Sequence, residues 1–268
     1  VRLPRGLSLT ADLELAVRSA GIIVVAVPSQ YLRSVIHRVR GLPMRNTAFL
    51  SVVKGLETGT AKRMSEVIAD ELGRVPIAVL SGPNVAPEIA GGQPAISVVA
   101  SRHPKLAAHL QRLLMDERFR VYTSRDVIGV ELGGALKNSI AIAAGISDGL
   151  GFGSNAKAAI ISRGLVEMAR LGTALGARKE TFWGISGLGD LITTCLGGRN
   201  RWFGEEIGKG RSAKAVLASI PTVIEGVTTT QAAVKLGRRL RIELPIIEQV
   251  HAVLFRHVPP KQSLRTLM

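Results

Sequence analysis

The run Glu131-Leu-Gly-Gly-Ala-Leu-Lys-Asn138 opens the part of the chain in which nearly everything is predicted to be helical. In a helix, the residues three, four and seven positions from Lys137 share its face. They are all apolar or lack a side chain: Val130, Gly133, Gly134, Ile140, Ala141 and Ala144. A helix with apolar residues on every side is buried. The run therefore predicts a core helix that carries a single lysine without a carboxylate on its own face.

Lys137 is the first candidate for a catalytic group. A buried lysine is rare unless it is paired or used, and loss of water lowers its pKa toward neutrality. Such an amine can exchange a proton with an alcohol or a carbonyl. The paired glycines one turn earlier, Gly133 and Gly134, are expected to leave room for a ligand. The alternative is an ordinary lysine whose ammonium reaches solvent at the end of the helix.

The chain before this run alternates strands and helices, which predicts a mostly parallel, doubly wound sheet. The change in character near residues 123–126 predicts a first domain over 1–124 and a helical domain over 125–268. The expected strands are Ile22–Val27, Ala48–Val53, Pro76–Leu80, Pro94–Ala100 and Arg120–Thr123, of which the first is predicted to be a buried parallel strand. The expected helices are Tyr31–Val39, Thr60–Leu72 and Pro104–Met115.

The beginning of the chain departs from a complete sheet of this type. Residue 1 is Val, and residues 1–12 are predicted to be a loop and the beginning of a helix. A dinucleotide-binding fold opens with a strand that runs into Gly-x-Gly-x-x-Gly. No such motif follows any predicted strand. Either the fold is a different one, or its opening unit is absent from this sequence.

Three predicted strands end in loops that suit ligand binding, because ligands of open α/β sheets lie beyond the carboxyl ends of the strands. The loops are Ala26-Val-Pro-Ser29, Val53-Lys-Gly-Leu-Glu57 and Ser81-Gly-Pro-Asn84. Lys54 lies directly at a strand end, where its ammonium could meet a phosphate or the reacting oxygen. A surface lysine in a turn is the alternative.

The segment Gly187-Leu-Gly-Asp-Leu-Ile-Thr-Thr-Cys195 holds one carboxylate in apolar surroundings. Asp190 could cap a helix, or it could hold Lys137 or accept a substrate hydroxyl. Thr194 is four residues later and shares a helical face with Asp190. The order Asp, Thr and then a Gly-Gly turn favours a small-molecule pocket.

A second group of polar residues follows two glycines. Arg199 and Asn200 are expected at a helix start, where a guanidinium and exposed N–H groups suit a phosphate. A solvent-facing basic cap is the alternative. Further along, Glu225 is expected in a glycine-containing turn, as a contact for a ribose or an amide.

Composition excludes several classes of protein. Apolar residues make up 46% and charged residues 21% of the chain, which argues against disorder. The net charge of +15 comes from scattered basic residues and aromatic residues are only 4%, so nucleic-acid binding is a weak hypothesis. No apolar run reaches the roughly 20 residues of a membrane span. The single cysteine, Cys195, suits a reducing cytoplasm and is expected in the core, and the histidines have no metal-ligand spacing, so no metal is expected.

Taken in order, these motifs resemble the NAD(P)-dependent glycerol-3-phosphate dehydrogenase family along almost the whole chain. The resemblance implies an incomplete Rossmann-like domain followed by an all-α domain. It also implies hydride transfer between NAD(P)H and dihydroxyacetone phosphate, giving sn-glycerol 3-phosphate for glycerophospholipid synthesis. The matching runs are Ala26–Ser29, Lys54–Glu57, Ser81–Ala86, Leu136–Asn138, Gly187–Leu191, Gly198–Arg201 and Val223–Gly226.

The resemblance also implies roles for individual residues. Lys137 matches the proton acceptor of the family, with Asn138 beside it, and Lys54, Asp190, Thr194, Arg199 and Asn200 match its substrate and phosphate neighbours. Gly82, Asn84 and Gly198 match the substrate side; bacterial members often carry Ser in place of Gly198, and Ser or Thr in place of Asn84. Lys54, Ala86, Arg199, Val223 and Glu225 match cofactor contacts.

Members of the family begin with a strand, Gly-x-Gly-x-x-Gly and a helix, so the resemblance implies that roughly 60 residues of an opening βαβ unit are absent here. The choice between NAD and NADP stays open, because the strand end that reads the ribose belongs to that unit. Two other functions remain open: another lysine-dependent hydroxyacid dehydrogenase of the same architecture, and an inactive fragment with a basic binding surface. A homodimer is also left open by the sequence.

Overall fold

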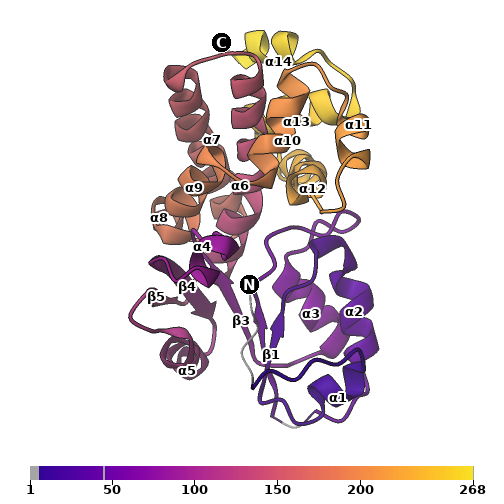
Figure 1. The fold of residues 1–268 in the computed structure, drawn as a ribbon, viewed down its shortest axis with the longest axis vertical. Coiled ribbons are helices and arrows are strands. Elements are labelled where there is room, and N and C mark those ends of the chain that lie inside the picture. The colour runs from indigo at the N-terminus through magenta and orange to yellow at the C-terminus, as the bar shows by residue number, and fades with distance from the viewer. Residues whose placement is uncertain (1–5, 45, 268) are drawn as a thin grey trace.

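The computed structural model describes residues 6–44 and 46–267. Its first half contains a five-stranded sheet in the order β1-β2-β3-β4-β5 (Figure 1). All neighbouring strands are parallel except β3 and β4, which are antiparallel. The mostly parallel sheet predicted from the sequence is therefore confirmed. The strands are β1 (Ile22–Val25), β2 (Ala48–Ser51), β3 (Ile77–Ser81), β4 (Ala95–Ser101) and β5 (Phe119–Ser124).

Helices cover both faces of this sheet. On β2, Phe49 packs with α2 and α3, whereas its neighbour Leu50 packs with α5. Adjacent residues of a strand point to opposite faces, so this alternation produces two separate apolar clusters. The helices of this half are α1 (Leu13–Val17), α2 (Leu32–Val39), α3 (Met64–Leu72), α4 (Ala86–Ala90) and α5 (Pro104–Leu114).

The sequence predictions fail in three places in this half. The first strand was expected to be buried and parallel. β1 is parallel to β2, but among residues 6–44 and 46–267 it has no second neighbour, and Val24 is 55% exposed. The helix expected from Thr60 begins at Met64, because Ala61 adopts a positive φ of 60° and Leu56 bridges Arg63 in a turn. The short helix α4 was not predicted. Of the expected opening loop, residues 1–5 lie outside the described part of the chain.

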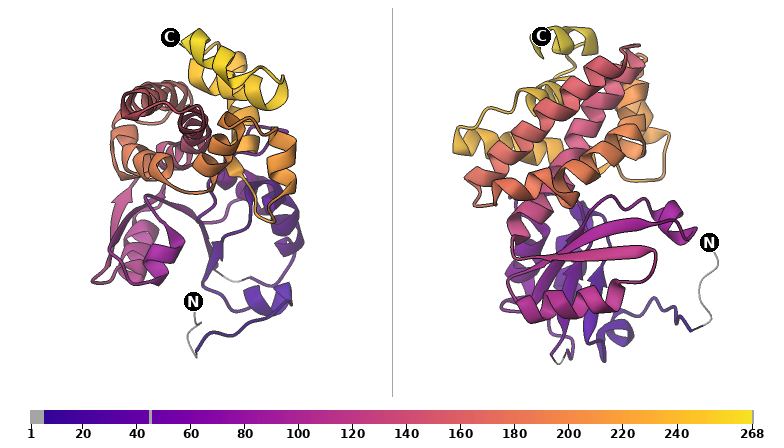
Figure 2. Two further views of the ribbon diagram at one scale, coloured as in Figure 1. Left: turned by 45° about the horizontal axis from the view of Figure 1, so that its top comes forward. Right: turned by 90° about the vertical axis from the view of Figure 1, so that its left-hand side faces the viewer.

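The second half consists of helices packed around the long helix α6 (Val127–Gly149) (Figure 2). Almost every residue of α6 is buried. The buried helix predicted around Lys137 is therefore confirmed. The side chain of Asp126 caps α6 by accepting the Gly129 N–H at 2.9 Å. The other helices are α7 (Ser154–Ala174), α8 (Lys179–Trp183), α9 (Asp190–Leu196), α10 (Arg199–Gly208), α11 (Ala213–Ala218), α12 (Glu225–Leu240), α13 (Pro245–Phe255) and α14 (Pro260–Leu267), with a π-helical turn at Ile185–Gly189.

By length and composition alone, α6 could cross a membrane. However, 94% of its most apolar window is buried inside the protein, as expected for a core helix.

Glycines allow α6 and α10 to touch through their backbones. A Cβ atom on Gly145 would overlap the Arg201 carbonyl, and one on Gly204 would overlap the Ile142 carbonyl. Gly149 and Gly208 repeat this contact one turn further along both helices. The spacing of four residues puts each glycine pair on one helical face. This close packing determines the distance between Asn138 on α6 and Asn200 on α10.

We expect Gly204→Ala to destabilise the protein by about 2 kcal/mol or more, because overpacking outweighs the gain of about 1 kcal/mol in helix propensity. The colliding atoms belong to the backbone of α6, which cannot rotate away. Urea unfolding measures the change, with Gly59→Ala as the control because nothing lies within 4 Å of its Cβ position. Equal stability of the two variants would contradict the close packing.

Helix α13 is capped by a residue from another helix. Its own N-cap residue, Leu244, offers no side-chain acceptor, and the helix begins with Pro245. The buried carboxylate of Glu167 on α7 accepts the N–H groups of Ile246 at 2.7 Å and Ile247 at 3.2 Å. Burial raises the pKa of Glu167 to about 7, against the opposing effect of these two hydrogen bonds.

This shift predicts how stability depends on pH. The folded protein binds the Glu167 proton more tightly than the unfolded chain does, so stability falls as the pH rises from about 4.5 to about 7. A shift of this size corresponds to about 3 kcal/mol. Glu167→Gln should remove this contribution, so the stability difference between pH 5 and pH 8 should be smaller in the variant than in the parent protein. Urea unfolding at both pH values measures it, and the same difference in both proteins would refute the assignment.

Candidate active site

Lys137 lies in the middle of α6 and meets a carboxylate from α9. Its Nζ is 2.5 Å from Asp190 Oδ1, and the two side chains are only 7% and 2% exposed. The residues are 53 positions apart in the sequence. Asp190 does not act as a helix cap: it is the first residue of α9, and its carboxylate faces the sheet domain and α6.

Lys54 reaches the same carboxylate from the end of β2. Its Nζ is 2.8 Å from Asp190 Oδ2 and donates to the Gly82 carbonyl at 2.7 Å. One aspartate therefore holds two ammonium groups, one from each half of the molecule. An ammonium has three N–H donors, so Lys54 keeps one donor after these two contacts.

Thr194, one turn after Asp190, completes the surroundings of Lys137. The Thr194 hydroxyl donates to the Asp190 carbonyl at 2.7 Å and accepts from Lys137 Nζ at 2.6 Å. Lys137 thus uses two of its donors on Asp190 and Thr194. The third N–H position remains for a substrate oxygen.

The pKa of Lys137 is lowered to about 8. Burial is the largest cause and the positive charge of Lys54 adds to it, whereas Asp190 opposes both. A pKa near 8 allows the amine to be protonated or neutral at physiological pH, which is the property of an effective general acid or base. The site can therefore exchange a proton with an alcohol or carbonyl placed at Lys137 Nζ.

The paired glycines before Lys137 have a different role from the one expected. A Cβ on Gly133 would lie 2.5 Å from the Ser186 carbonyl, and one on Gly134 would overlap the Ser81 hydroxyl. The space beside them is filled by protein. They let α6 pack tightly against β3 and the π-helical turn, and this packing brings Lys137 within reach of Lys54 and Asp190.

Asn138 and Asn200 are buried beside this cluster and bond to each other. Asn200 Nδ2 donates to Asn138 Oδ1 at 2.9 Å, and Asn138 Nδ2 donates to the Lys54 carbonyl at 3.1 Å. Sequence spacing contains no indication of this pair, because the two residues are 62 positions apart.

The start of α10 offers uncapped backbone N–H groups to an anion near the lysines. No side chain caps α10, and its N-cap residue Gly198 has a φ of 92°, which favours glycine. Arg199 is exposed at the first position of the helix. Because Asn200 bonds to the residue after Lys137, this helix end lies beside the proton-transfer group. Uncapped N–H groups with a guanidinium suit a phosphate.

The other predicted site residues lie along the edge where the two halves meet. The Gly82 carbonyl holds Lys54, whereas Asn84 bonds to the Ile96 carbonyl and the Ser97 hydroxyl of β4. Ala86 is exposed at the start of α4, and Val223 is half-buried just before α12.

Glu225 was expected in a turn, but it is the first residue of α12. Its carboxylate accepts the Ser29 N–H at 3.0 Å and the Ser29 hydroxyl, which follows β1. The turn expected from Gly226 was wrong because that glycine serves close packing inside the helix. The loop Ala26–Ser29 and Glu225 were both noticed in the sequence, but their contact was not.

Cys195 belongs to the core, as expected. It is fully buried, and burial raises the pKa of its thiol to about 12. Within residues 6–44 and 46–267, no three His, Cys, Asp or Glu side chains gather in a way that could hold a metal ion.

A dinucleotide would fit this fold at the carboxyl ends of β1, β2 and β3, where such sheets bind their ligands. At that edge, Gly55 lets the loop after β2 pack directly against Ser29 and Glu225, because any side chain there would collide with them. Ser29, Lys54 and Glu225 would then face the nicotinamide half. None of the strands in the described part of the chain is followed by a Gly-x-Gly-x-x-Gly for the pyrophosphate.

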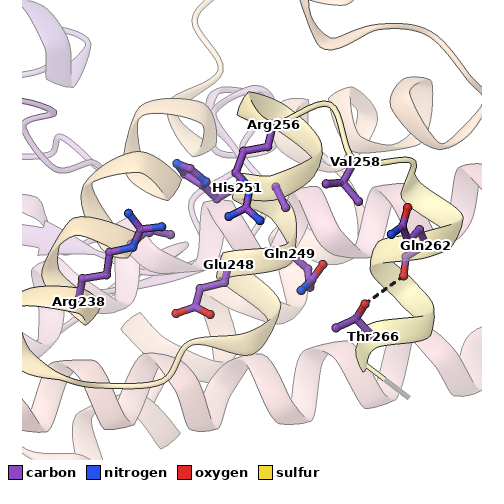
Figure 3. A pocket seen from close by; sticks show the side chains of 10 residues that line it. Arg238, Glu248, Gln249, His251, Arg256, Val258, Gln262 and Thr266 are labelled. Carbon is purple, nitrogen blue, oxygen red and sulfur yellow. Dashed lines mark hydrogen bonds between the residues drawn. The ribbon is translucent and has the colours of Figure 1, made fainter.

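A separate surface pocket of about 290 Å³ lies between α12, α13 and α14. Figure 3 shows Arg238, Glu248, His251 and Arg256 among the side chains that line it. It adjoins the C-terminal half of α12, whereas Glu225 and the lysine cluster lie at the other end of that helix. This pocket is therefore distinct from the reacting groups.

The sheet, the helical domain and the two lysines that meet at Asp190 together define a lysine-dependent dehydrogenase of the two-domain type. Family models assign both halves: "NAD-dependent glycerol-3-phosphate dehydrogenase N-terminus" matches residues 1–107, and the corresponding C-terminus matches residues 126–265. The chain belongs to the NAD-dependent glycerol-3-phosphate dehydrogenase family.

Individual relatives agree with this assignment. A glycerol-3-phosphate dehydrogenase [NAD(P)+] from Dehalococcoides mccartyi is 48% identical over 99% of this chain and 75% of its own length. One from Prosthecochloris aestuarii is 45% identical over 100% of this chain and 82% of its own length. The crystal structure of glycerol-3-phosphate dehydrogenase from Coxiella burnetii superposes with a TM-score of 0.95 at 41% identity, over 98% of this chain and 82% of that one.

Proposed function

We propose that the protein interconverts dihydroxyacetone phosphate and sn-glycerol 3-phosphate with NAD(P)H, and so supplies glycerophospholipid synthesis. The observation that carries this proposal is the Lys137–Asp190–Lys54 cluster beside the uncapped start of α10. It combines a proton-transfer group with a place for a phosphate. Family membership assigns the same reaction.

In this proposal one group of residues transfers the proton and another group binds the phosphate. Lys137 Nζ gives its third proton to the carbonyl oxygen during reduction and takes it back during oxidation. Asp190 and Thr194 keep the amine in place, and the Lys54 ammonium stabilises negative charge on the same oxygen. NAD(P)H supplies the hydride when bound.

Arg199 and the start of α10 bind the phosphate in this proposal, with Gly198 allowing close approach. Gly82 and Asn84 border the substrate, and Ala86, Val223 and Glu225 border the cofactor. Support comes from their placement along the edge where sheet and helices meet. Asn138 contacts the Lys54 loop and is assigned to the same machinery.

The main rival is a hydroxyacid dehydrogenase of the same architecture. A D-mandelate dehydrogenase shares the fold with a TM-score of 0.56, but at 13% identity it carries no information about substrate. An uncapped helix start with an arginine favours a phosphate ester over a plain hydroxyacid. An inactive fragment with a basic surface is the other rival.

One assay separates the three functions. NADH or NADPH oxidation is followed spectrophotometrically with dihydroxyacetone phosphate, and with unphosphorylated dihydroxyacetone and a 2-ketoacid as comparisons. We expect turnover with the phosphate ester at least 10²-fold above the others, since a hydrogen-bonded group that is missing costs several kcal/mol. Preference for the ketoacid would favour the hydroxyacid dehydrogenase, and no turnover with any of them would overturn the proposal.

Three further predictions accompany this proposal: a domain division, a cytoplasmic location and a homodimer. We place the domain division between residues 124 and 125, which is supported by the end of β5 at Ser124 and the start of α6 at Val127. A cytoplasmic location and a homodimer remain predictions. Gel filtration with light scattering tests the second of these.

A further inference from the structure

The chain that follows Lys54 forms a closed hairpin, residues 56–63, before α3 begins. Leu56 bridges Arg63 in an antiparallel pair, and the Glu57 N–H donates to the Lys62 carbonyl at 3.0 Å. Arg63 therefore lies across from a residue that is only two positions after Lys54. Whatever holds Arg63 in place also restrains the chain that carries the Lys54 ammonium.

This hairpin belongs to the sheet half of the chain but packs into the helical half. Leu56 and Ala61 are 1% and 5% exposed and lie in the apolar core of the helical half. Lys235 of α12 donates to the Gly59 carbonyl of the hairpin. The hairpin is therefore a contact between the two halves of the molecule as well as the continuation of the Lys54 loop.

A buried carboxylate on α6 holds the closing end of the hairpin. Glu131 Oε2 is 2.5 Å from Arg63 Nη1 and accepts the Ser65 hydroxyl at 2.6 Å, and Glu131 Oε1 accepts the Ser65 N–H at 2.8 Å. The side chains of Glu131 and Arg63 are only 6% and 11% exposed. Hydrogen bonds that involve a charged group are the strong ones in proteins. This contact therefore joins α6 firmly to the end of the hairpin and to the first turn of α3.

Helix α6 connects this contact to the proton-transfer group. Glu131 and Lys137 are on the same buried helix, and its rise separates their Cα atoms by roughly 9 Å along the axis. Within the described residues, the Glu131 carboxylate bonds to Arg63 and Ser65 and to none of the reacting groups. Any effect of Glu131 on the reaction must therefore pass through the hairpin.

We propose that Glu131 is a positioning residue for the reaction. It holds Arg63 against α6, and through the hairpin it restrains Lys54. The Lys54 ammonium then stays at the Asp190 carboxylate, which it shares with Lys137. This inference rests on the proposed dehydrogenase function.

Two buried carboxylates give a matched pair of variants. Glu131→Gln keeps the size of the side chain and an oxygen for the Ser65 N–H, but it loses the charge that pairs with Arg63. Glu167→Gln also neutralises a buried carboxylate that accepts backbone N–H groups, but at the start of α13. Hydrogen–deuterium exchange of the free protein should be faster at residues 54–63 in Glu131→Gln only, and Glu167→Gln should affect residues 245–250 instead.

Kinetics provide the second measurement. For Glu131→Gln we expect kcat to fall by about 10-fold with KM for dihydroxyacetone phosphate changed less than about threefold, because small misplacement of reacting groups costs up to about 10²-fold. The positive charge of Lys54 lowers the pKa of Lys137. Loosening Lys54 should therefore move the midpoint of the pH profile for sn-glycerol 3-phosphate oxidation upward. Glu167→Gln should leave both kcat and this midpoint unchanged.

A purely structural role of Glu131 gives a different pattern. Glu131→Gln with the parent's kcat and midpoint, or with unchanged exchange at residues 54–63, would overturn the proposal. If Glu131→Gln does not fold, Arg63→Lys keeps the charge but shortens the contact, and its exchange at residues 54–63 should also be faster; unchanged exchange there counts against the proposal too. The exchange result does not depend on turnover, so a parent protein that fails to reduce dihydroxyacetone phosphate would contradict the proposed function and not the positioning of the hairpin.

Discussion

Replacing Lys137 by methionine is expected to lower kcat by about 10³-fold in both directions, within the range that general acid–base groups contribute. Methionine fills the same space in the core but carries no proton, so packing around α6 is retained. NAD(P)H binding, measured by fluorescence titration, should change little because Lys137 bonds to Asp190 and Thr194 of α9, and Lys54 keeps its own contact with Asp190 in the variant.

The matched control for this variant is Lys157→Met. Lys157 also pairs with an aspartate, Asp148 at 2.9 Å, but on α7 and away from the site. Its loss should leave kcat within about twofold, since ion pairs at partly exposed positions contribute little. Near-normal turnover of Lys137→Met would remove Lys137 from the mechanism.

The pH profiles of the parent protein test the same role of Lys137 in proton transfer. Oxidation of the alcohol needs a neutral amine at Lys137, so its rate should rise with pH and level off above about 8. Reduction of the ketone needs the ammonium, so its rate should be level below about 8 and fall above it.

Asp190→Asn has the second largest expected effect. The carboxylate is 2% exposed and holds Lys137 and Lys54 together. Removing one partner of a buried ion pair destabilises a protein by about 3–5 kcal/mol. We also expect kcat to fall by about 10²-fold, because neither ammonium stays in place. Asp190 raises the pKa of Lys137, so in the variant the midpoint of the oxidation profile should move below about 8.

A surface carboxylate with the same number of partners is the control. Asp70 also accepts from two cations, Arg33 at 3.0 Å and Lys62 at 2.6 Å, but its side chain is 33% exposed. Asp70→Asn should cost less than about 1 kcal/mol. If Asp190→Asn does not fold, Asp190→Glu retains the charge and should keep the midpoint near 8 while kcat falls. An unchanged kcat in Asp190→Glu would contradict the positional argument.

Much of the fold follows from local pattern. Alternating apolar strands and helices gave the sheet, and the all-apolar surroundings of Lys137 gave its burial, because both depend on periods of two and 3.6 residues that are written in the sequence. The helix start at Arg199 was also predictable from the preceding glycines. The antiparallel pairing of β4 with β3 was not, since the direction of a strand depends on how the chain returns to the sheet.

In the candidate site, too, local sequence pattern predicted some features and the tertiary structure decided the rest. The sequence by itself supplied a buried lysine, a lone aspartate in an apolar segment, and a lysine at a strand end. Only the tertiary structure decided that Lys54 and Lys137 share the carboxylate of Asp190, and that Asn138 and Asn200 continue the contact to α12. Spacing along the chain says nothing about residues 53 to 136 positions apart. The meeting of Asn138 with Asn200 depends on the backbone contact of α6 with α10. The meeting of Lys54 with the Lys137–Asp190 pair depends on the packing of α6 against β3, which brings the two halves of the molecule together.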